Sequence, residues 1–226
     1  MSASAAKKLT KVLEVLGRRY GSPERPPTTD PFELILYENI AYLARPDKRR
    51  AAFELLQSTV GTSAPMLLKA SQKSLQRVTS HGILPATFAD KLRECAHILI
   101  EECQGDLGPV VRSPIKAAKK ALQKFPGIGE PGAEKILLFS GMAPLLGLDS
   151  NGLRVLTRLG LIADQKSYVQ TYAASQELAG LLKLSIAQAQ SAHLLLQEHG
   201  RVLCKRSKPR CSDCPLVSNC AFPTAE

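Results

Sequence analysis

One stretch, residues 124–158, limits most strongly the folds open to this 226-residue chain. Its sequence PGIG (126–129) predicts a tight turn between two helices, because glycine accepts backbone angles that bulkier residues resist. Pro131 suits the first turn of the second helix, where the missing N–H would be unpaired anyway. Backbone amides at such a turn can bind a phosphate group. The candidate phosphate contacts are therefore Gly127, Ile128 and Gly129.

Helical spacing of apolar residues continues along the rest of the chain. No segment alternates convincingly between apolar and polar residues, which would indicate a half-buried strand. The sequence therefore predicts an all-α protein, with 45–47 (Arg-Pro-Asp) ending its second helix. Besides the helix that begins near Pro131, the expected helices span residues 7–20, 31–44, 48–60, 64–70, 71–79, 86–104, 113–124, 151–159, 167–182 and 185–199.

The charge balance favours a polyanionic partner. The chain carries 30 Lys and Arg against 20 Asp and Glu, a formal net charge of +10. Neutralising phosphates releases counterions and supplies most non-specific affinity for nucleic acid, although many basic proteins are merely soluble. No apolar run approaches membrane-spanning length, and the start lacks the apolar core and cleavage site of a signal peptide. We therefore expect a soluble intracellular protein with no membrane partner.

Four of the six cysteines lie close together near the C-terminal end: Cys204, Cys211, Cys214 and Cys220. In a chain without a secretion signal, disulfides are disfavoured and a metal site is the natural interpretation. Four sulfur ligands suit a structural zinc or a [4Fe–4S] cluster, and spacing alone does not choose between them. Cys95 and Cys103 lie in a helical pattern and are expected to be structural thiols.

Two motifs resemble a known family. The sequence FPGIG (125–129), followed by LDSNGLRVL (148–156), resembles the helix-hairpin-helix, Gly/Pro-rich loop and aspartate of one DNA glycosylase superfamily, which includes endonuclease III and the adenine glycosylases. The second motif is more similar to the adenine glycosylases. The resemblance implies a six-helix domain near 31–143 and a second helical domain made of 1–30 with 144–226. It also implies that a monomer binds double-stranded DNA, with a damaged or mismatched base, between these domains.

The cysteine spacing, with HGR at 199–201 and Pro209 before the second cysteine, resembles the cluster loop of the same family. The resemblance thus implies a [4Fe–4S] cluster rather than zinc. Basic side chains between the first two cysteines would form a rigid loop against the DNA backbone, although a charge run is usually a solvated face. These candidate DNA contacts are Lys205, Arg206, Lys208 and Arg210.

Two carboxylates are the candidate catalytic residues. Cleavage of an N-glycosidic bond needs a better leaving group and stabilised positive charge on the sugar, tasks for a protonated and an ionised carboxyl respectively. Asp149 precedes a helix whose dipole favours the ionised form, although it could be a plain N-cap. Glu38 interrupts an apolar helix, where burial would raise its pKa. Residues 31–38 also fit the pattern P-(Y/F)-x-x-x-L-x-E, which carries the catalytic glutamate in adenine and thymine mismatch glycosylases.

Enzymes of this kind flip the nucleotide into a pocket and commonly fill the gap with an inserted side chain. We expect Ile83 or Leu84 to supply the inserted side chain, whereas Tyr37 and Asn39 could line the pocket or be core polar residues. The candidates for the two roles together are Tyr37, Asn39, Tyr42, Ile83, Leu84 and Asn151.

The sequence departs from the family at two places. Where the bifunctional lyases carry a lysine, this chain has Pro131, so no amine is available there to form a Schiff base. Lys135, one helical turn further on, is expected to be a solvated surface lysine, with a replacement lyase role as the alternative. The glutamine-rich run of the adenine glycosylases is replaced by AYLA (41–44), so their contacts to the opposite base do not carry over.

Three functions remain open at this point. The presence of both Glu38 and Asp149 favours a monofunctional DNA N-glycosylase. Pro131 and the altered run 41–44 favour a non-catalytic protein of the same fold that recognises damaged or abasic DNA. A weak glycosylase and AP lyase that uses Lys135 is the third. Any of them would act in the cytoplasm at the nucleoid in a bacterium or archaeon, and in the nucleus otherwise.

Overall fold

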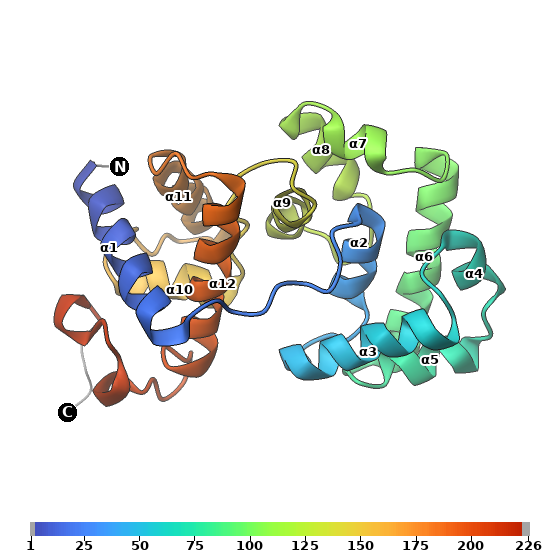
Figure 1. Ribbon diagram of the computed structural model, residues 1–226, viewed down its shortest axis with the longest axis horizontal. Helices are drawn as coiled ribbons and strands as arrows, with labels where there is room; N and C mark the ends of the chain where they lie inside the picture. Colours follow the sequence, from blue (N-terminus) through green and yellow to red (C-terminus); the bar gives the residue numbers. More distant parts are fainter. Residues whose placement is uncertain (1–2, 223–226) are drawn as a thin grey trace. The chain divides into compact units, whose positions relative to one another are not determined.

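The computed structural model describes residues 3–222, which contain twelve α-helices, two short 3₁₀ helices and no strand (Figure 1). The predicted all-α class is confirmed. The chain forms two compact units, one from Pro26–Ala143 and one from the described parts of Met1–Arg25 and Pro144–Glu226. The boundaries expected from the sequence lie at 30/31 and 143/144. No helix in the described part of the chain is long and apolar enough to cross a membrane.

The unit formed by 26–143 is built around a buried helix, Pro31–Asn39. Phe32, Leu34, Ile35 and Leu36 are all buried on this helix, because its apolar residues lie on nearly every side. Helices from later in the unit, α6 and α9, cover it. The helices of the unit are α2 (Pro31–Asn39), α3 (Pro46–Thr59), α4 (Ala64–Lys69), α5 (Gln72–Thr79), α6 (Pro85–Cys103), α7 (Gly108–Arg112), α8 (Ile115–Leu122) and α9 (Glu130–Phe139).

The two ends of α2 differ in how well the sequence predicted them. At the start, Asp30 is the N-cap and accepts a hydrogen bond from the Glu33 amide at 2.9 Å. At the end, the helix stops at Asn39 rather than at residue 44, because residues 40–43 form a turn in which Leu43 has a φ of 57°. The prediction that 45–47 ends α2 is also wrong. Pro46 begins α3, where its missing N–H costs no hydrogen bond.

The region before the hairpin also differs from the prediction. The helix expected at 113–124 is α8, which is shorter at both ends because Pro114 has an extended backbone and Gln123 caps the helix. An additional helix, α7, precedes it. This helix has five residues, too few for apolar spacing to reveal it in the sequence.

Helices α8 and α9 form the predicted hairpin, and neighbouring side chains hold its turn. Gly127 has a φ of 75°, and a Cβ at this position would lie 2.6 Å from Asn39 Oδ1. Asn39, on α2, donates a hydrogen bond from Nδ2 to the Pro126 carbonyl at 2.9 Å. On the other side, Lys119 of α8 pairs with Glu130 and Glu134 of α9 at 2.6 Å each. The turn is therefore fixed both to the core and across the hairpin.

The other unit packs two helices closely around a leucine-rich core. Its helices are α1 (Ala3–Tyr20), α10 (Ser150–Arg158), α11 (Tyr168–Gly180) and α12 (Ile186–Val202), and short 3₁₀ turns span Cys211–Asp213 and Val217–Asn219. Helices α10 and α12 approach so closely that a Cβ on Gly200 would lie 2.5 Å from the Asn151 carbonyl oxygen. Only glycine fits there without a shift of the backbone. The fully buried leucines of this core include Leu9, Leu16, Leu148, Leu156 and Leu196.

Candidate active site

Asp149 is the N-cap of α10, and its carboxylate accepts four hydrogen bonds. Oδ1 accepts the backbone amides of Asn151 at 3.0 Å and of Gly152 at 2.9 Å. Oδ2 accepts from the side-chain amides of Asn151 at 3.1 Å and of Gln197, on α12, at 2.9 Å. The N-cap role, which was the alternative interpretation, is therefore present, and the same contacts hold the carboxylate in one orientation.

The hydrogen bonds also determine the charge of Asp149. Burial by itself would raise the pKa of this carboxyl, but the Gly152 amide, the Gln197 and Asn151 side chains and the nearby His193 outweigh it and lower the pKa below its ordinary value. The group is therefore ionised at neutral pH. Its catalytic role stays a prediction.

Arg154 fixes the orientation of Asn151, which had been a candidate pocket residue. Its Nη2 donates to Asn151 Oδ1 at 2.8 Å and to the Gly200 carbonyl at 2.7 Å, and its Nε donates to the Cys204 carbonyl at 2.8 Å. With Oδ1 occupied by the guanidinium, Asn151 presents its NH₂ group to Asp149. Asn151 thus belongs to the support of Asp149. The arginine stands in the motif at 148–156, but the sequence analysis gave it no role of its own.

Glu38 is surrounded differently, because its oxygens face two cations. Oε2 pairs with Lys135 Nζ on α9, and Oε1 lies 3.9 Å from Arg49 on α3. The side chain of Lys135 is only 15% exposed, so the prediction of a solvated surface lysine is wrong. Opposite charges at this distance favour an ionised carboxylate and act against the effect of burial that the sequence suggested. The sequence missed this pair because 97 positions separate its partners.

Tyr37 and Asn39 lie in the interior and do not line an open pocket. The Tyr37 ring packs edge-on against Phe53, with ring centroids 5.5 Å apart. Asn39 is 1% exposed, and its Nδ2 donates to the Ile35 carbonyl as well as to the hairpin turn. The alternative interpretation, that these are core polar residues, describes the surroundings of both of them, and a role in the base pocket stays a prediction.

The remaining intercalation candidates share one surface with a residue that the sequence analysis missed. We call Tyr42, Leu43, Ile83 and Leu84 the paired-turn surface, since the Ile83 amide donates to the Tyr42 carbonyl at 3.2 Å. All four are exposed, Leu43 most of all at 72%. Leu43 and Leu84 have φ angles of 57° and 54°, a region that bulky residues rarely adopt. The strained backbone thus presents two leucines outward from neighbouring turns.

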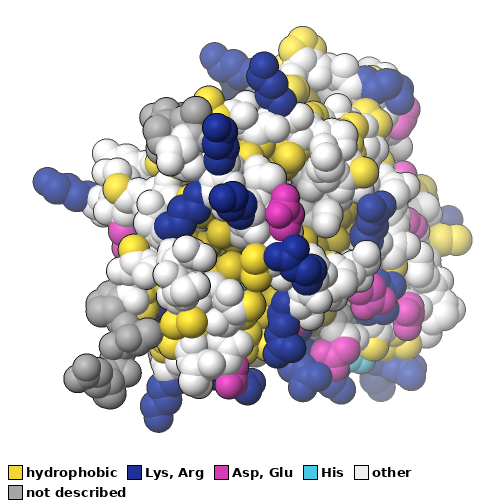
Figure 2. Space-filling model, turned by 60° about the vertical axis from the view of Figure 1, so that its left-hand side comes forward, with side chains coloured by type: hydrophobic (Ala, Val, Ile, Leu, Met, Phe, Trp, Pro, Cys, Tyr) yellow, Lys and Arg dark blue, Asp and Glu magenta, His cyan; other side chains and the backbone are white. Residues whose placement is uncertain are grey.

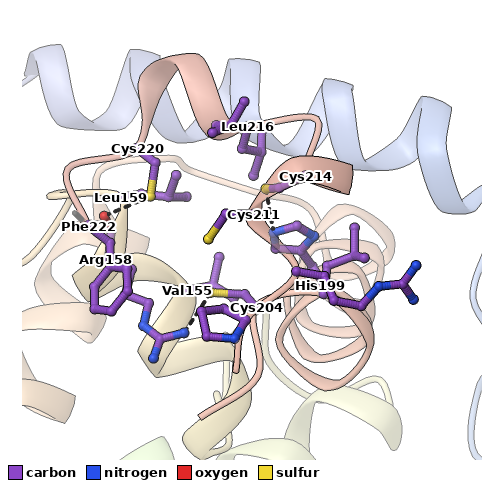
Figure 3. A pocket seen from close by; sticks show the side chains of 14 residues that line it. Val155, Arg158, Leu159, His199, Cys204, Cys211, Cys214, Leu216, Cys220 and Phe222 are labelled. Carbon is purple, nitrogen blue, oxygen red and sulfur yellow. Dashed lines mark hydrogen bonds between the residues drawn. The ribbon is translucent and has the colours of Figure 1, made fainter. Parts of the chain in front are cut away.

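The four tail cysteines line one pocket, as Figure 3 shows. Each is a free thiol, and the walls between them are mainly apolar. Three hydrogen bonds involve the sulfurs: Arg158 Nη1 donates to Cys204 Sγ at 3.5 Å, Cys220 Sγ donates to the Arg158 carbonyl at 3.2 Å, and His199 Nε2 lies 3.6 Å from Cys214 Sγ. Among residues 3–222, no three His, Cys, Asp or Glu side chains are placed so that together they could hold a single metal ion. The pocket lining comprises Val155, Leu159, Leu203, Leu216 and Phe222 besides the cysteines and polar groups.

The pocket residues fit a cofactor held by thiolates. The four cysteines line one pocket, where the Arg158 guanidinium donates to Cys204 Sγ and the His199 ring lies within hydrogen-bonding distance of Cys214 Sγ. Such polar neighbours stabilise the negative charge of thiolate ligands. The second nitrogen of His199, Nδ1, lies 3.0 Å from the Tyr20 hydroxyl and fixes the ring. Burial lowers the pKa of His199 to about 4. The imidazole is therefore neutral at pH 7.

The basic loop between the first two cysteines is exposed. Arg158 holds its backbone by donating to the carbonyls of Lys205 at 2.7 Å and Arg206 at 3.1 Å. Arg210 pairs with Asp213, so part of its charge is already compensated. Lys and Arg side chains also outnumber Asp and Glu on the face drawn in Figure 2. Contact of this loop with DNA stays a prediction.

Comparison with known proteins finds endonuclease III sequences and DNA glycosylase structures. No protein-family model matches the chain. Endonuclease III of Escherichia coli K12 is 26% identical over 219 residues, covering 94% of this chain and 95% of that protein. A trapped covalent endonuclease III–DNA intermediate superposes with a TM-score of 0.76 at 18% identity, covering 95% of both chains. A thermostable thymine-DNA glycosylase gives a TM-score of 0.75 at 19% identity, covering 96% of both chains.

These likenesses first define the chain as a protein of endonuclease III-like fold. Together with the sequence relatives, they support the helix-hairpin-helix DNA glycosylase superfamily, which the motifs at 125–129 and 148–156 predicted. The superfamily prediction is therefore confirmed, whereas the roles of individual residues have only the geometry described above.

Proposed function

We propose that this protein is a DNA N-glycosylase that removes a damaged or mismatched base from double-stranded DNA. The observation that carries the proposal is Asp149, a carboxylate held ionised at a helix N-terminus in a chain of endonuclease III-like fold. Loss of a base leaves positive charge on the sugar, and a fixed carboxylate stabilises that charge. The helix-hairpin-helix turn beside it in the sequence supports binding of the DNA backbone.

In the proposed mechanism, Asp149 stabilises the developing cation and Glu38 handles a proton. Glu38 can exchange a proton with Lys135, its ion-pair partner, and so deliver one to the leaving base or accept one from water. The base leaves with its bonding electrons, and water adds to C1′ of the sugar. The products are a free base and an abasic site, without strand cleavage.

Binding is proposed to use three parts of the chain. The amides of 127–129 and the basic side chains of 205–210 would contact phosphates, which gives affinity without sequence preference. The paired-turn surface would fill the space of the flipped nucleotide, because apolar side chains inserted between bases unstack them. The protein would act as a monomer in the compartment that holds the genome, the nucleoid in a bacterium or archaeon and the nucleus otherwise.

The four tail cysteines are proposed to hold a [4Fe–4S] cluster, with the pocket of Figure 3 as its site. When bound, such a cluster would supply a structural cross-link and no step of base removal. Cys204, Cys211, Cys214 and Cys220 would be its ligands, and the Arg158 and His199 side chains would stabilise the charge of the sulfurs.

A second candidate function is favoured by the contact between Lys135 and Glu38. An amine beside a carboxylate can lose its proton and attack C1′, displacing the base and forming a Schiff base with the opened sugar. One structural neighbour, an endonuclease III trapped as a covalent intermediate with DNA, supports covalent chemistry in a protein of this fold. Against this, Pro131 stands where the resembled lyases carry their lysine, so we place hydrolysis first.

The test is a panel of duplexes that carry different damaged or mismatched bases. Release of free base is measured directly, and strand cleavage is measured with and without alkali. Base release with alkali-dependent cleavage supports the glycosylase, while cleavage without alkali supports the lyase. Tight binding to damaged or abasic duplexes with no base release from any of them would support the non-catalytic alternative.

A further inference from the structure

Asp149 accepts a hydrogen bond from one residue that the sequence motifs do not include. Gln197 lies on α12, 48 positions away, and donates from Nε2 to Asp149 Oδ2 at 2.9 Å. The other three donors come from the first turn of α10 itself, namely the amide and side chain of Asn151 and the amide of Gly152. Gln197 therefore supplies the only hydrogen bond recorded, within the described chain, between this carboxylate and another element.

The number of these bonds limits what Asp149 can do. An ionised carboxylate has about four acceptor positions, and four donors fill them here. No position in the plane of the carboxylate remains for a water molecule that would give up a proton. The negative charge itself still acts on a neighbouring cation, because electrostatic attraction does not need a free lone pair.

Three titratable side chains near Asp149 interact with it electrostatically, without a hydrogen bond to its carboxylate that the structure records. His193 comes from α12, Arg154 from α10 and Tyr168 from α11. Arg154 is held by its bonds to Asn151 and to the carbonyls of Gly200 and Cys204, so it acts on Asp149 from a fixed position. Gln197 differs from all three because it donates a hydrogen bond to the carboxylate directly and has no ionisable group. Its removal would change the hydrogen bonding of Asp149 without changing the local net charge.

We propose that Gln197 is a positioning residue for Asp149. Its amide fixes the plane of the carboxylate and keeps it charged, so that Asp149 serves as a permanent negative charge beside the sugar cation rather than as the base that activates water. The part played in the reaction rests on the proposed glycosylase function. The control of the charge on Asp149 by Gln197 does not rest on that function, and the pKa that reports it can be measured without DNA.

The experiment is a graded series at position 197, with the pKa of Asp149 read by carbon NMR of the side-chain carboxyl in the DNA-free protein. Gln197→Leu removes one donor at similar size and should raise the pKa by about one unit, the value of one hydrogen bond to a charged group. Gln197→Glu places a like charge at the same position and should raise it further. Gln197→Lys restores a donor and adds a cation, so the pKa should be at or below that of the wild type.

A control variant separates positioning from general damage to α12. Glu198→Gln changes the next residue, whose carboxylate pairs with Arg201 on the surface, and should leave the pKa of Asp149 unchanged. The ordered response Lys, wild type, Leu, Glu is the signature of the proposed role. If the three variants at position 197 lose stability but the pKa of Asp149 does not follow this order, the proposal is wrong.

The activity arm uses any duplex from which the wild type releases a base. The acidic limb of the kcat/KM profile should move to higher pH in Gln197→Leu, and the rate should recover when the pH is raised above the limb. A rate that stays low at every pH would contradict the proposal, since it would show a loss that recharging Asp149 does not repair. If the wild type releases no base but the pKa series is ordered, the proposed function fails while the positioning role stands.

Discussion

The two candidate catalytic carboxylates belong to different units and are stabilised by different means. Asp149 accepts four hydrogen bonds from neutral amides, two of them backbone groups whose positions are set by α10. Glu38 instead pairs with Lys135 and lies near Arg49. Both side chains are partly buried, so each would be costly to ionise without such partners.

The difference in partners implies a difference in use. Amide donors keep the same charge at every working pH, so the ionised state of Asp149 is built into the fold. The partner of Glu38 is itself an acid–base group, so a proton can pass between the two side chains. A fixed charge suits stabilisation of a sugar cation, whereas an adjustable pair suits proton transfer.

The largest expected effect comes from neutralising either carboxylate. Asp149→Asn removes the fixed charge, and Glu38→Gln removes the proton-transfer group. Each should reduce the rate of base release by on the order of a hundredfold or more, as is typical when an acid–base or charge-stabilising group is lost. Single-turnover kinetics on a competent duplex, with protein in excess, measure this rate.

Binding serves as the control for these two variants. Neither side chain is expected to contribute much to affinity for the duplex, so the dissociation constant should change far less than the rate. Rates equal to wild type in both variants would remove the proposed mechanism. A loss in only one of them would show that the two carboxylates are not both required.

The next effect concerns the cysteine-lined pocket. Cys211→Ser should remove iron and acid-labile sulfide from anaerobically purified protein, because the pocket would lose one of four thiolates. The basic loop would then lose its fixed shape, and affinity for DNA should fall by roughly tenfold, the value of one or two phosphate contacts. Cys103→Ser, on α6, is the matched control and should change neither the iron content nor the affinity. Stoichiometric zinc in the wild type, without iron, would overturn the cluster assignment.

How far the sequence predicts the site depends on how local the contacts are. The cap of α10 follows from Asp149 and the three residues after it, so a motif of four residues was sufficient. The partners of Glu38 and the donor Gln197 come from distant segments and leave no local pattern. A weak signal for Gln197 did exist, since a polar residue follows the buried run 194–196 and lies on the same helix as buried His193.

The helices were also predicted well where local signals determine them, and the prediction failed where a contact with a distant segment decides the structure. Caps and apolar spacing located most helices, but the apolar run at 40–43 continued the pattern of α2 while the backbone turned away. The turn is stabilised by its neighbour, because the close packing of Gly82 against the backbone of 41–42 leaves no space for a Cβ. The two turns lie about 40 residues apart in the sequence, so neither segment alone shows a pattern that predicts their contact.

Lys135 gives a smaller but sharper test of the comparison. Lys135→Met keeps much of the side-chain volume and removes the cation from Glu38, which favours the protonated carboxyl. If Lys135 only tunes Glu38, base release should change by roughly tenfold or less and its pH profile should shift, since a pKa change of one unit corresponds to that factor. Lys119→Met is the matched control, because Lys119 forms its ion pairs with Glu130 and Glu134 instead.

Borohydride trapping decides between tuning and covalent chemistry. The wild type should give no covalent adduct with DNA under borohydride if the protein is a hydrolase. An adduct that Lys135→Met abolishes and Lys119→Met retains would show that the lyase amine has moved one helical turn along α9. Lys135 would then be the nucleophile and Glu38 its proton acceptor.

The smallest expected effect is in the salt dependence of DNA binding, and it compares two basic side chains of one loop. Lys208 is exposed, whereas Arg210 pairs with Asp213 at 2.5 Å and is partly neutralised before DNA arrives. Each phosphate contact contributes about 0.9 to the slope of log affinity against log salt. Lys208→Ala should therefore lower the slope by about one. Arg210→Ala should lower the slope by less, because the charge of Arg210 is already partly compensated by Asp213. The slope for Asp213→Asn separates the contribution of Arg210 from that of Asp213. This variant should bind DNA more tightly if Arg210, freed from its ion pair, reaches a phosphate. Slopes equal to wild type in all three variants would mean that the loop does not contact DNA, and the binding face would then have to be sought at the hairpin turn alone.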